Sequence, residues 1–201
     1  MKKPSKAEAF DIVQDLKGAV SSLHIELVER LELYFAPPVP KVPRDGWDWA
    51  AKVVADASDK REYLRYVNVT ADGDVIGCDG ARVHIARGAA VGMAPGLYQP
   101  ATRQPATGVA GTYPDVMRVI SSGTGDAIES AEKIVRNVTD KTHGTVYVVN
   151  GSAEVSARYL DEALAGDAPD CARHWPDKQG GKYQGTNRFG QYVVMGMRPQ
   201  K

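Results

Sequence analysis

Apolar residues recur at helical spacing through residues 6–35. Positions three and four apart lie on one face of a helix, so this spacing predicts a long amphipathic helix over residues 1–35. Its apolar stripe comprises Ala9, Val13, Leu16, Val20, Leu23, Leu27, Leu31 and Tyr34. Gly18, Ser21 and Ser22 weaken the helix in isolation. We therefore expect the stripe to be buried against a helix of another copy of the chain, or alternatively against the body of this one.

The helical pattern stops at a segment rich in proline. Residues 36–46 contain Pro37, Pro38, Pro40 and Pro43. Proline removes a backbone donor and favours extended geometry, so this segment is expected to be a stiff linker. The predicted organisation is a helix over residues 1–35, a linker over 36–46 and one domain over 47–201.

Beyond the linker, alternating apolar and polar positions predict short antiparallel strands with a few helices. Asp72-Gly73 and Asp79-Gly80 separate alternating runs, which indicates two tight hairpins. The predicted strands cover residues 63–70, 75–78, 81–86, 97–100, 145–150 and 188–197. The predicted helices cover 47–58, 126–137 and 157–165, with Gly166 ending the last one, and 168–186 reads as a polar loop. The fold class is α+β, without a recognisable internal sequence repeat.

Composition places the chain among globular proteins, with 43% apolar residues and 25 basic against 25 acidic side chains. No apolar run reaches membrane-spanning length and the first residues do not resemble a secretory signal, so a cytoplasmic location without membrane contact is expected. Zero net charge disfavours a protein that coats nucleic acid, although a local basic face remains possible. Such a face would use Lys52, Lys60, Lys133, Arg136 and Arg158 on or beside predicted helices.

Candidate chemistry is sparse. Cysteine and histidine spacings match no zinc site, and no phosphate loop, dinucleotide fingerprint or nucleophile elbow is present, so neither a metal nor a cofactor is expected. Asp72, Asp74 and Asp79 are explained by the turns that they begin. His84 could form an acid-base pair with Asp79, but alternation places it on a strand face. A non-enzymatic protein is favoured over a hydrolase that uses these two residues.

Four segments resemble bacterial sliding clamps, the β subunit of DNA polymerase III. Residues 63–83 are similar to the clamp strand and its "TDGHRL" hairpin, and 113–120 to the "FPDYRRVLP" connector. Residues 158–164 are similar to the "YLLDAL" helix, and 192–198 to the terminal "YVVMPMR". The four segments occur in the same order as in the family, and the last lies near the C-terminus in both.

The resemblance implies a clamp-like fold: antiparallel sheets with helices on one face, preceded here by the long N-terminal helix. It also implies a pocket for the clamp-binding peptides of replication proteins, with apolar walls for an anchor, adaptable methionines and arginines at the rim. Carried over by position, the pocket residues are Cys78, Gly80, Ala81, Arg82, Val83, Pro114, Arg118, Val119, Val193, Val194, Met195, Met197 and Arg198.

Departures from the family pattern bear on assembly and on peptide preference. Cys78, Ala81 and Gly196 stand where clamps have threonine, histidine and proline, which would widen the pocket and loosen its last strand. A clamp ring needs six repeated subdomains, and this chain has room for one or two. A reduced, phage-related clamp would then encircle double-stranded DNA as a homo-oligomer of three or more chains. Alternatively, the chain keeps only the pocket and acts as an adaptor or competitor without a ring.

Overall fold

The computed structural model describes residues 43, 45–135, 145–151, 153–168, 171–176 and 181–197. The chain divides into two units, residues 1–41 and 42–201, and every described residue belongs to the second. The predicted N-terminal helix and most of the predicted linker lie outside the described residues.

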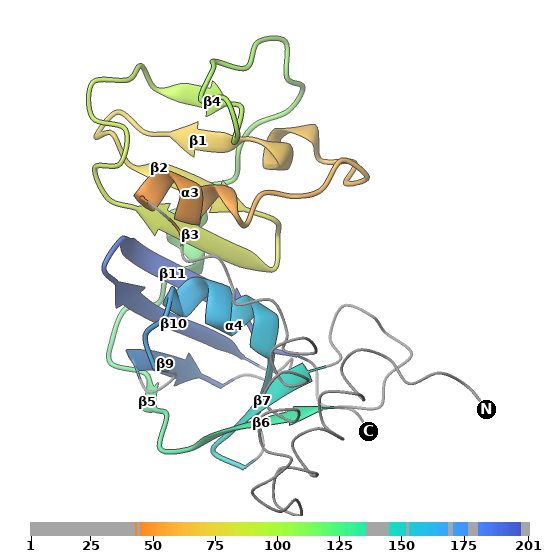
Figure 1. Cartoon of the computed structure of the whole chain (residues 1–201), viewed down its shortest axis with the longest axis vertical. Helices are drawn as coiled ribbons and strands as arrows, with labels where there is room; N and C mark the ends of the chain where they lie inside the picture. The colour runs from red at the N-terminus through yellow and green to blue at the C-terminus, as the bar shows by residue number, and fades with distance from the viewer. Residues whose placement is uncertain are drawn as a thin grey trace, which may run out of the picture. The chain divides into compact units, whose positions relative to one another are not determined.

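This unit is an α+β fold with antiparallel sheets and few helices, as the alternation predicted. The larger sheet has the strand order β4-β1-β2-β3-β11-β10-β9-β5, and a smaller one has the order β6-β7-β8 (Figure 1). The larger sheet comprises β1 (Val67–Val69), β2 (Val75–Cys78), β3 (Arg82–Ala86), β4 (Gly96–Tyr98), β5 (Asp126–Ala127), β9 (Ala172–Trp175), β10 (Lys182–Asn187) and β11 (Gly190–Met195). The remaining elements are β6 (Ala131–Val135), β7 (Thr145–Val149), β8 (Ala153–Ser156), the α-helices α3 (Gly46–Ala51) and α4 (Ala157–Leu164), and the 3₁₀ helices η2 (Glu62–Arg65) and η3 (Val116–Val119).

The larger sheet contains a structural repeat that the sequence does not reveal. In each half a helix precedes three strands that pair in sequence order: α3 with β1, β2 and β3, then α4 with β9, β10 and β11. The two halves meet where β3 pairs antiparallel with β11, with His84 opposite Tyr192. The strand order on either side of this pair is mirrored, as an approximate two-fold axis requires.

Equivalent glycines occupy the same place in both halves. Gly77 lies opposite His84, and Gly185 lies opposite Tyr192. A Cβ on Gly77 would lie 1.9 Å from the carbonyl oxygen of Ala50 in α3, and one on Gly185 would lie 2.5 Å from the Tyr192 hydroxyl. Both positions therefore need glycine because another group closely approaches the strand there.

The larger sheet has a different core on each face. Both helices pack on one face, where Trp49 of α3 and Leu160 of α4 join Tyr192 in a single cluster (Figure 1). The opposite face holds a second cluster that includes Ile85 and Val193, covered by the segment that leads into η3. Because side chains alternate along a strand, neighbouring residues of β3 and β11 contribute to different cores.

Two element predictions were wrong. Residues 126–137 were expected to form a helix, but they contain β5 and β6, and Ala131–Val135 pairs along its whole length with β7. A short segment with few apolar residues fits both the helical period and the strand period, and the pairing with β7 makes this segment a strand. Residues 168–186 were expected to be a loop, but they supply β9 and most of β10. These strands are polar in composition, and burial of His174 and Gln184 within the sheet hides the usual alternation.

Two further predictions differ in extent. The helix expected over residues 47–58 ends at Ala51, after which the chain turns so that Ala55 N donates to the carbonyl of Leu64 at 2.8 Å. The strand expected from residue 63 begins instead as the 3₁₀ helix η2, and the strand itself is β1.

The close contact at Gly77 yields a stability prediction. Gly77→Ala forces a methyl group against the backbone of α3, which cannot move aside without displacing the helix. We expect the free energy of unfolding to fall by at least about 2 kcal/mol, measured by urea denaturation. Gly92→Ala is the control: a Cβ there meets nothing within 4 Å, and only its φ of +88° should cost about 1 kcal/mol. Equal losses in the two variants would contradict the proposed contact.

Candidate functional site

A cavity of about 220 Å³ lies where β2, β3, the η3 segment and the end of β11 meet. The predicted pocket residues that line it are Cys78, Gly80, Ala81, Arg82, Val83, Pro114, Val119, Val193 and Met195. Five further residues complete the lining: Arg61, Tyr63, Leu64, Asp115 and Val116. Segments far apart in the sequence are thus brought together around one space.

The turn between β2 and β3 forms one wall and is built by Asp79. Its Oδ1 accepts from the backbone N–H groups of Ala81 and Arg82, both at 2.8 Å. Gly80 follows with a φ of +91°, a conformation that favours glycine. Asp79 Oδ2 also accepts from Nε of Arg82 at 2.9 Å, so the side chain of Arg82 folds back over the turn.

The η3 segment forms a second wall. Asp115 caps η3 by accepting from the N–H of Met117 at 3.1 Å. Val116 then points into the core opposite the helices, which leaves Met117 and Val119 53% and 39% exposed. Upstream, the hydroxyl of Tyr113 donates to the carbonyl of Ile76 at 3.1 Å and ties the segment to β2.

The third wall is the end of β11, where alternation sorts the side chains. Val193 is buried on the cavity side, whereas Val194 is buried in the core beneath the helices and does not line the cavity. Met195 returns to the cavity side and is 42% exposed at its rim. Its N–H donates to the carbonyl of Ala81 at 2.9 Å, which fastens the strand end to the turn.

The floor of the cavity is apolar and uncharged. Leu64, Cys78, Val83 and Val193 are each buried in the same cluster. Burial raises the pKa of the Cys78 thiol, and its sulfur accepts from the N–H of Gly80 at 3.4 Å. The thiol is thus held in its neutral form and acts as a small apolar group.

Arginines supply the polar part of the wall. Arg82 is paired with Asp79 at 2.9 Å and also with Glu162 of α4. Arg61 is paired with Asp59 at 2.7 Å and donates to the carbonyl of Asp79 at 3.1 Å. The cavity therefore combines an apolar floor with donors that are held in place by carboxylates and a carbonyl oxygen.

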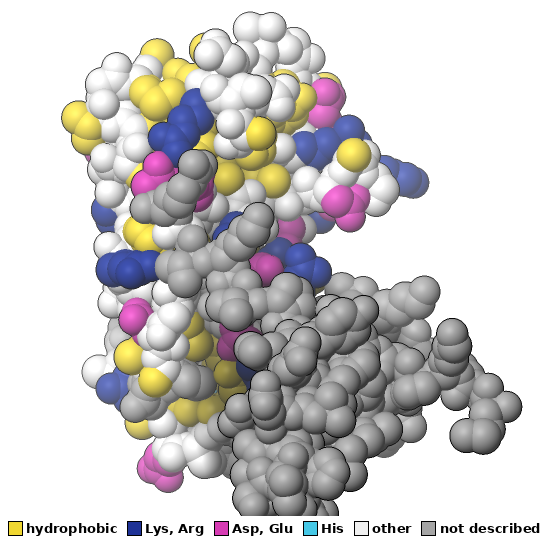
Figure 2. All heavy atoms as spheres, viewed as in Figure 1, with side chains coloured by type: hydrophobic (Ala, Val, Ile, Leu, Met, Phe, Trp, Pro, Cys, Tyr) yellow, Lys and Arg dark blue, Asp and Glu magenta, His cyan; other side chains and the backbone are white. Residues whose placement is uncertain are grey.

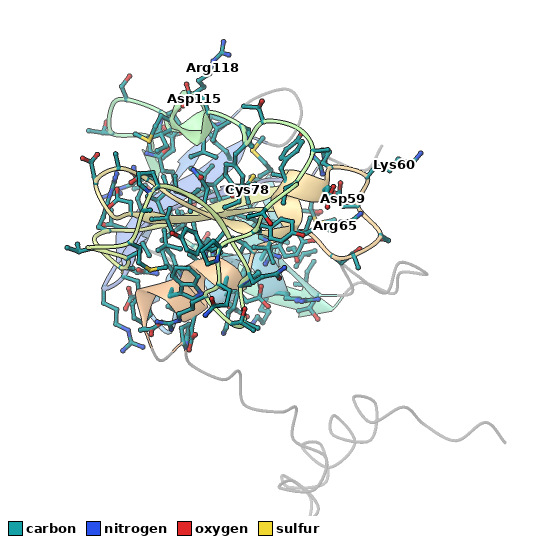
Figure 3. All side chains as sticks on the ribbon, turned by 90° about the horizontal axis from the view of Figure 1, so that it is seen from above. Asp59, Lys60, Arg65, Cys78, Asp115 and Arg118 are labelled. Carbon is teal, nitrogen blue, oxygen red and sulfur yellow. The ribbon has the colours of Figure 1, made fainter. Side chains whose placement is uncertain are left out.

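Four predicted pocket residues are not part of this lining. Val194 faces the opposite core. Arg118 is exposed and extends away from the body in Figure 3, whereas Cys78 lies inside it. Met197 is half-buried and its N–H donates to the carbonyl of Glu154 at 2.8 Å. Arg198 lies outside the described residues.

The sequence contained a signal for two of the lining residues that were missed. Tyr63 and Leu64 belong to the segment that resembles the clamp strand, but that segment was expected to serve only as a strand. Because η2 is helical, Leu64 turns into the core beside Val83 instead of alternating along a strand. Arg61 lies outside the regular elements and donates to the turn at Asp79. No residue spacing in the sequence indicates this contact.

The predicted DNA-binding residues do not form one uncompensated basic surface. Lys133 pairs with Asp161 at 2.8 Å, and Arg158 pairs with Glu162 at 3.2 Å. Lys52 caps the end of α3, Lys60 lies on the loop before η2 (Figure 3), and Arg136 lies outside the described residues. Figure 2 shows Lys and Arg interspersed with Asp and Glu over the visible face.

His84 and Asp79 are engaged with different partners. His84 is fully buried beneath α3, where its ring stacks on Trp49 at 4.2 Å and its Nδ1 lies 3.1 Å from the Trp49 carbonyl oxygen. Asp79 is engaged in the turn with Arg82. The two side chains do not form the acid-base pair that a hydrolase would need.

Within the described residues, no group of three or more His, Cys, Asp or Glu side chains could hold a metal ion. No helix in this part of the chain has the length and apolar character needed to cross a bilayer. Comparison of the chain with protein-family models, curated proteins and solved structures gave no match.

The environment of His84 predicts a pH dependence of stability. Burial, reinforced by Arg82 and Lys52, lowers the pKa of His84 from its ordinary value of 6.5 to about 3. As the pH falls below 6.5, His84 is protonated in the unfolded chain but stays neutral in the folded one. The free energy of unfolding therefore decreases until about pH 3. The loss from this group is up to about 5 kcal/mol.

Urea denaturation of the wild type and of His84→Asn at several pH values measures this contribution. Asparagine cannot titrate in this range, and its amide can replace the interaction of Nδ1 with the Trp49 carbonyl. We expect the stability advantage of the wild type over this variant to shrink between pH 6.5 and 4. Parallel pH profiles for the two proteins would show that His84 does not titrate as its burial requires.

Proposed function

We propose that this chain is a sliding-clamp-like DNA processivity factor that binds clamp-binding peptides of replication proteins in the cavity. One observation carries the proposal. The turn at Asp79, the η3 segment and the end of β11 line a single cavity, and each lies in a segment that resembles part of the peptide-binding pocket of bacterial sliding clamps. Chance similarity of separate short segments gives no reason for them to converge in space.

The cavity suits a short peptide with an apolar anchor. Its floor consists of buried aliphatic side chains and a neutral thiol, which favours a leucine or phenylalanine side chain. Val119 and Met195 in its lining remain exposed, and methionine adapts to anchors of different shape. The arginine donors of the wall would fix the polar atoms of the peptide.

In this proposal the chain acts in the cytoplasm as a homo-oligomer of three or more copies around double-stranded DNA. Duplex contacts would be made to phosphates, without reading bases, by basic side chains on or near the helices. Lys60 is the described candidate that we place first, because it is exposed on the loop before η2.

A second function is favoured by the charge compensation on α4. Asp161 and Glu162 pair with Lys133 and Arg158, which reduces the positive potential that phosphate contacts would use. A protein with the cavity but without a ring would act as an adaptor or competitor for clamp-binding peptides. The two proposals share the peptide site and differ in assembly and DNA binding.

Peptide binding is tested at the rim of the cavity. Met195→Ala removes an exposed apolar side chain from the wall, so the dissociation constant for a fluorescein-labelled clamp-binding peptide should rise about tenfold in anisotropy titrations. Val91→Ala is the matched control, because Val91 is 77% exposed and lies outside the cavity lining. Failure of the wild type to bind the peptide would overturn both proposals.

Assembly separates the two proposals. A processivity factor should give a mass of at least three chains in light scattering and should bind a 20-base-pair duplex with an affinity that falls steeply as salt increases. An adaptor should remain a monomer or dimer that binds the peptide but not the duplex. Lys60→Gln should weaken duplex binding only in the first case.

A further inference from the structure

Arg82 in the cavity wall is held by both halves of the larger sheet. It lies on β3 and only 6% of its side chain is exposed. Its Nε donates to Asp79 in the adjacent turn at 2.9 Å, and its Nη1 donates to Oε2 of Glu162, 80 residues further along the chain. The guanidinium carbon also lies 4.0 Å from the ring centroid of Tyr159, one turn before Glu162 on α4.

The carboxylates of Asp79 and Glu162 have different roles in holding Arg82. Asp79 lies in the same turn as Arg82, so the pair moves as one piece and cannot fix the turn relative to the other half. Glu162 belongs to α4, which is packed on β11 of the second half. Its bond to Arg82 therefore fixes the turn at Asp79, which forms one wall of the cavity, relative to the second half.

We propose that Glu162 is a positioning residue for the peptide-binding cavity, acting through Arg82. This inference rests on the function proposed above. Arg82 in turn holds Asp79, whose carboxylate builds the turn that forms one wall of the cavity. With Glu162 in place this wall is preorganised. Without it, a ligand must order the turn at the cost of its own affinity.

The same helix provides matched controls. Asp161 precedes Glu162 but engages Lys133 and the hydroxyl of Tyr147, both at 2.8 Å, and does not line the cavity. Arg158 shares the carboxylate of Glu162, but its side chain is 66% exposed and an exposed pair contributes little. A role specific to Glu162 therefore predicts strong effects at one position and weak effects at its neighbours.

The test is an anisotropy titration of the fluorescein-labelled clamp-binding peptide into full-length variants. Glu162→Gln and Asp161→Asn each remove one negative charge and leave an amide of similar shape on α4. We expect Glu162→Gln to weaken binding about tenfold, because it removes the charge-assisted bond to Arg82, and Asp161→Asn to change it less than twofold. Arg158→Gln should also stay within twofold.

A double-variant comparison tests whether Glu162 acts through Arg82. Arg82→Gln with Glu162→Gln should bind the peptide as weakly as Arg82→Gln alone, since the second change then has nothing left to disturb. Additive losses would overturn the inference, as would wild-type affinity in Glu162→Gln. If the wild type binds the peptide, either of these two results overturns the inference and leaves the proposed function intact. If the wild type does not bind the peptide, the proposed function and this inference are overturned together.

Thermal unfolding followed by circular dichroism verifies that each variant is folded at the assay temperature. If Glu162→Gln is unfolded there, Glu162→Asp takes its place, since it keeps the charge and shortens the reach by one methylene. It should weaken binding by about three- to fivefold. Unchanged affinity in this folded variant would overturn the inference.

Discussion

The antiparallel pairing of β3 with β11 is the interaction on which the rest of the structure depends. It joins two halves that each consist of a helix followed by three paired strands. Because both strands pass through the middle of the sheet, alternation along them divides the molecule into a core under the helices and a core under the η3 segment. The cavity forms where the second core reaches the strand ends.

The pairing also explains how a small cavity can combine apolar and charged walls. Arg82 and Val83 are neighbours on β3, so one lies against carboxylates while the other enters the apolar floor. The buried charge is tolerated because Asp79 and Glu162 both compensate it and Tyr159 covers it. The same carboxylates that stabilise the fold thus shape the cavity.

Much of the second unit could be predicted from local pattern. Asp-Gly turns and the strand patterns of β2, β3 and β11 follow from the conformational preferences of a few adjacent residues. The end of α4 does not, because its left-handed C-cap is Ala165 and not the glycine that follows it. The polar strands β9 and β10 could not be predicted, because burial of His174 and Gln184 depends on partners elsewhere in the chain. For β6 the deciding factor was its pairing with β7.

For the cavity, the sequence by itself determined which segments contribute, through their resemblance to a known pocket and the turn chemistry of Asp79 and Gly80. Only the tertiary structure decided which side chains of those segments face the cavity. It placed Val193 inside and Val194 on the other face, turned Arg118 outward, brought Arg61 to the turn at Asp79, and paired Glu162 with Arg82 behind that turn. The reason is physical: a local pattern constrains backbone conformation, whereas the direction of a side chain depends on what packs against it.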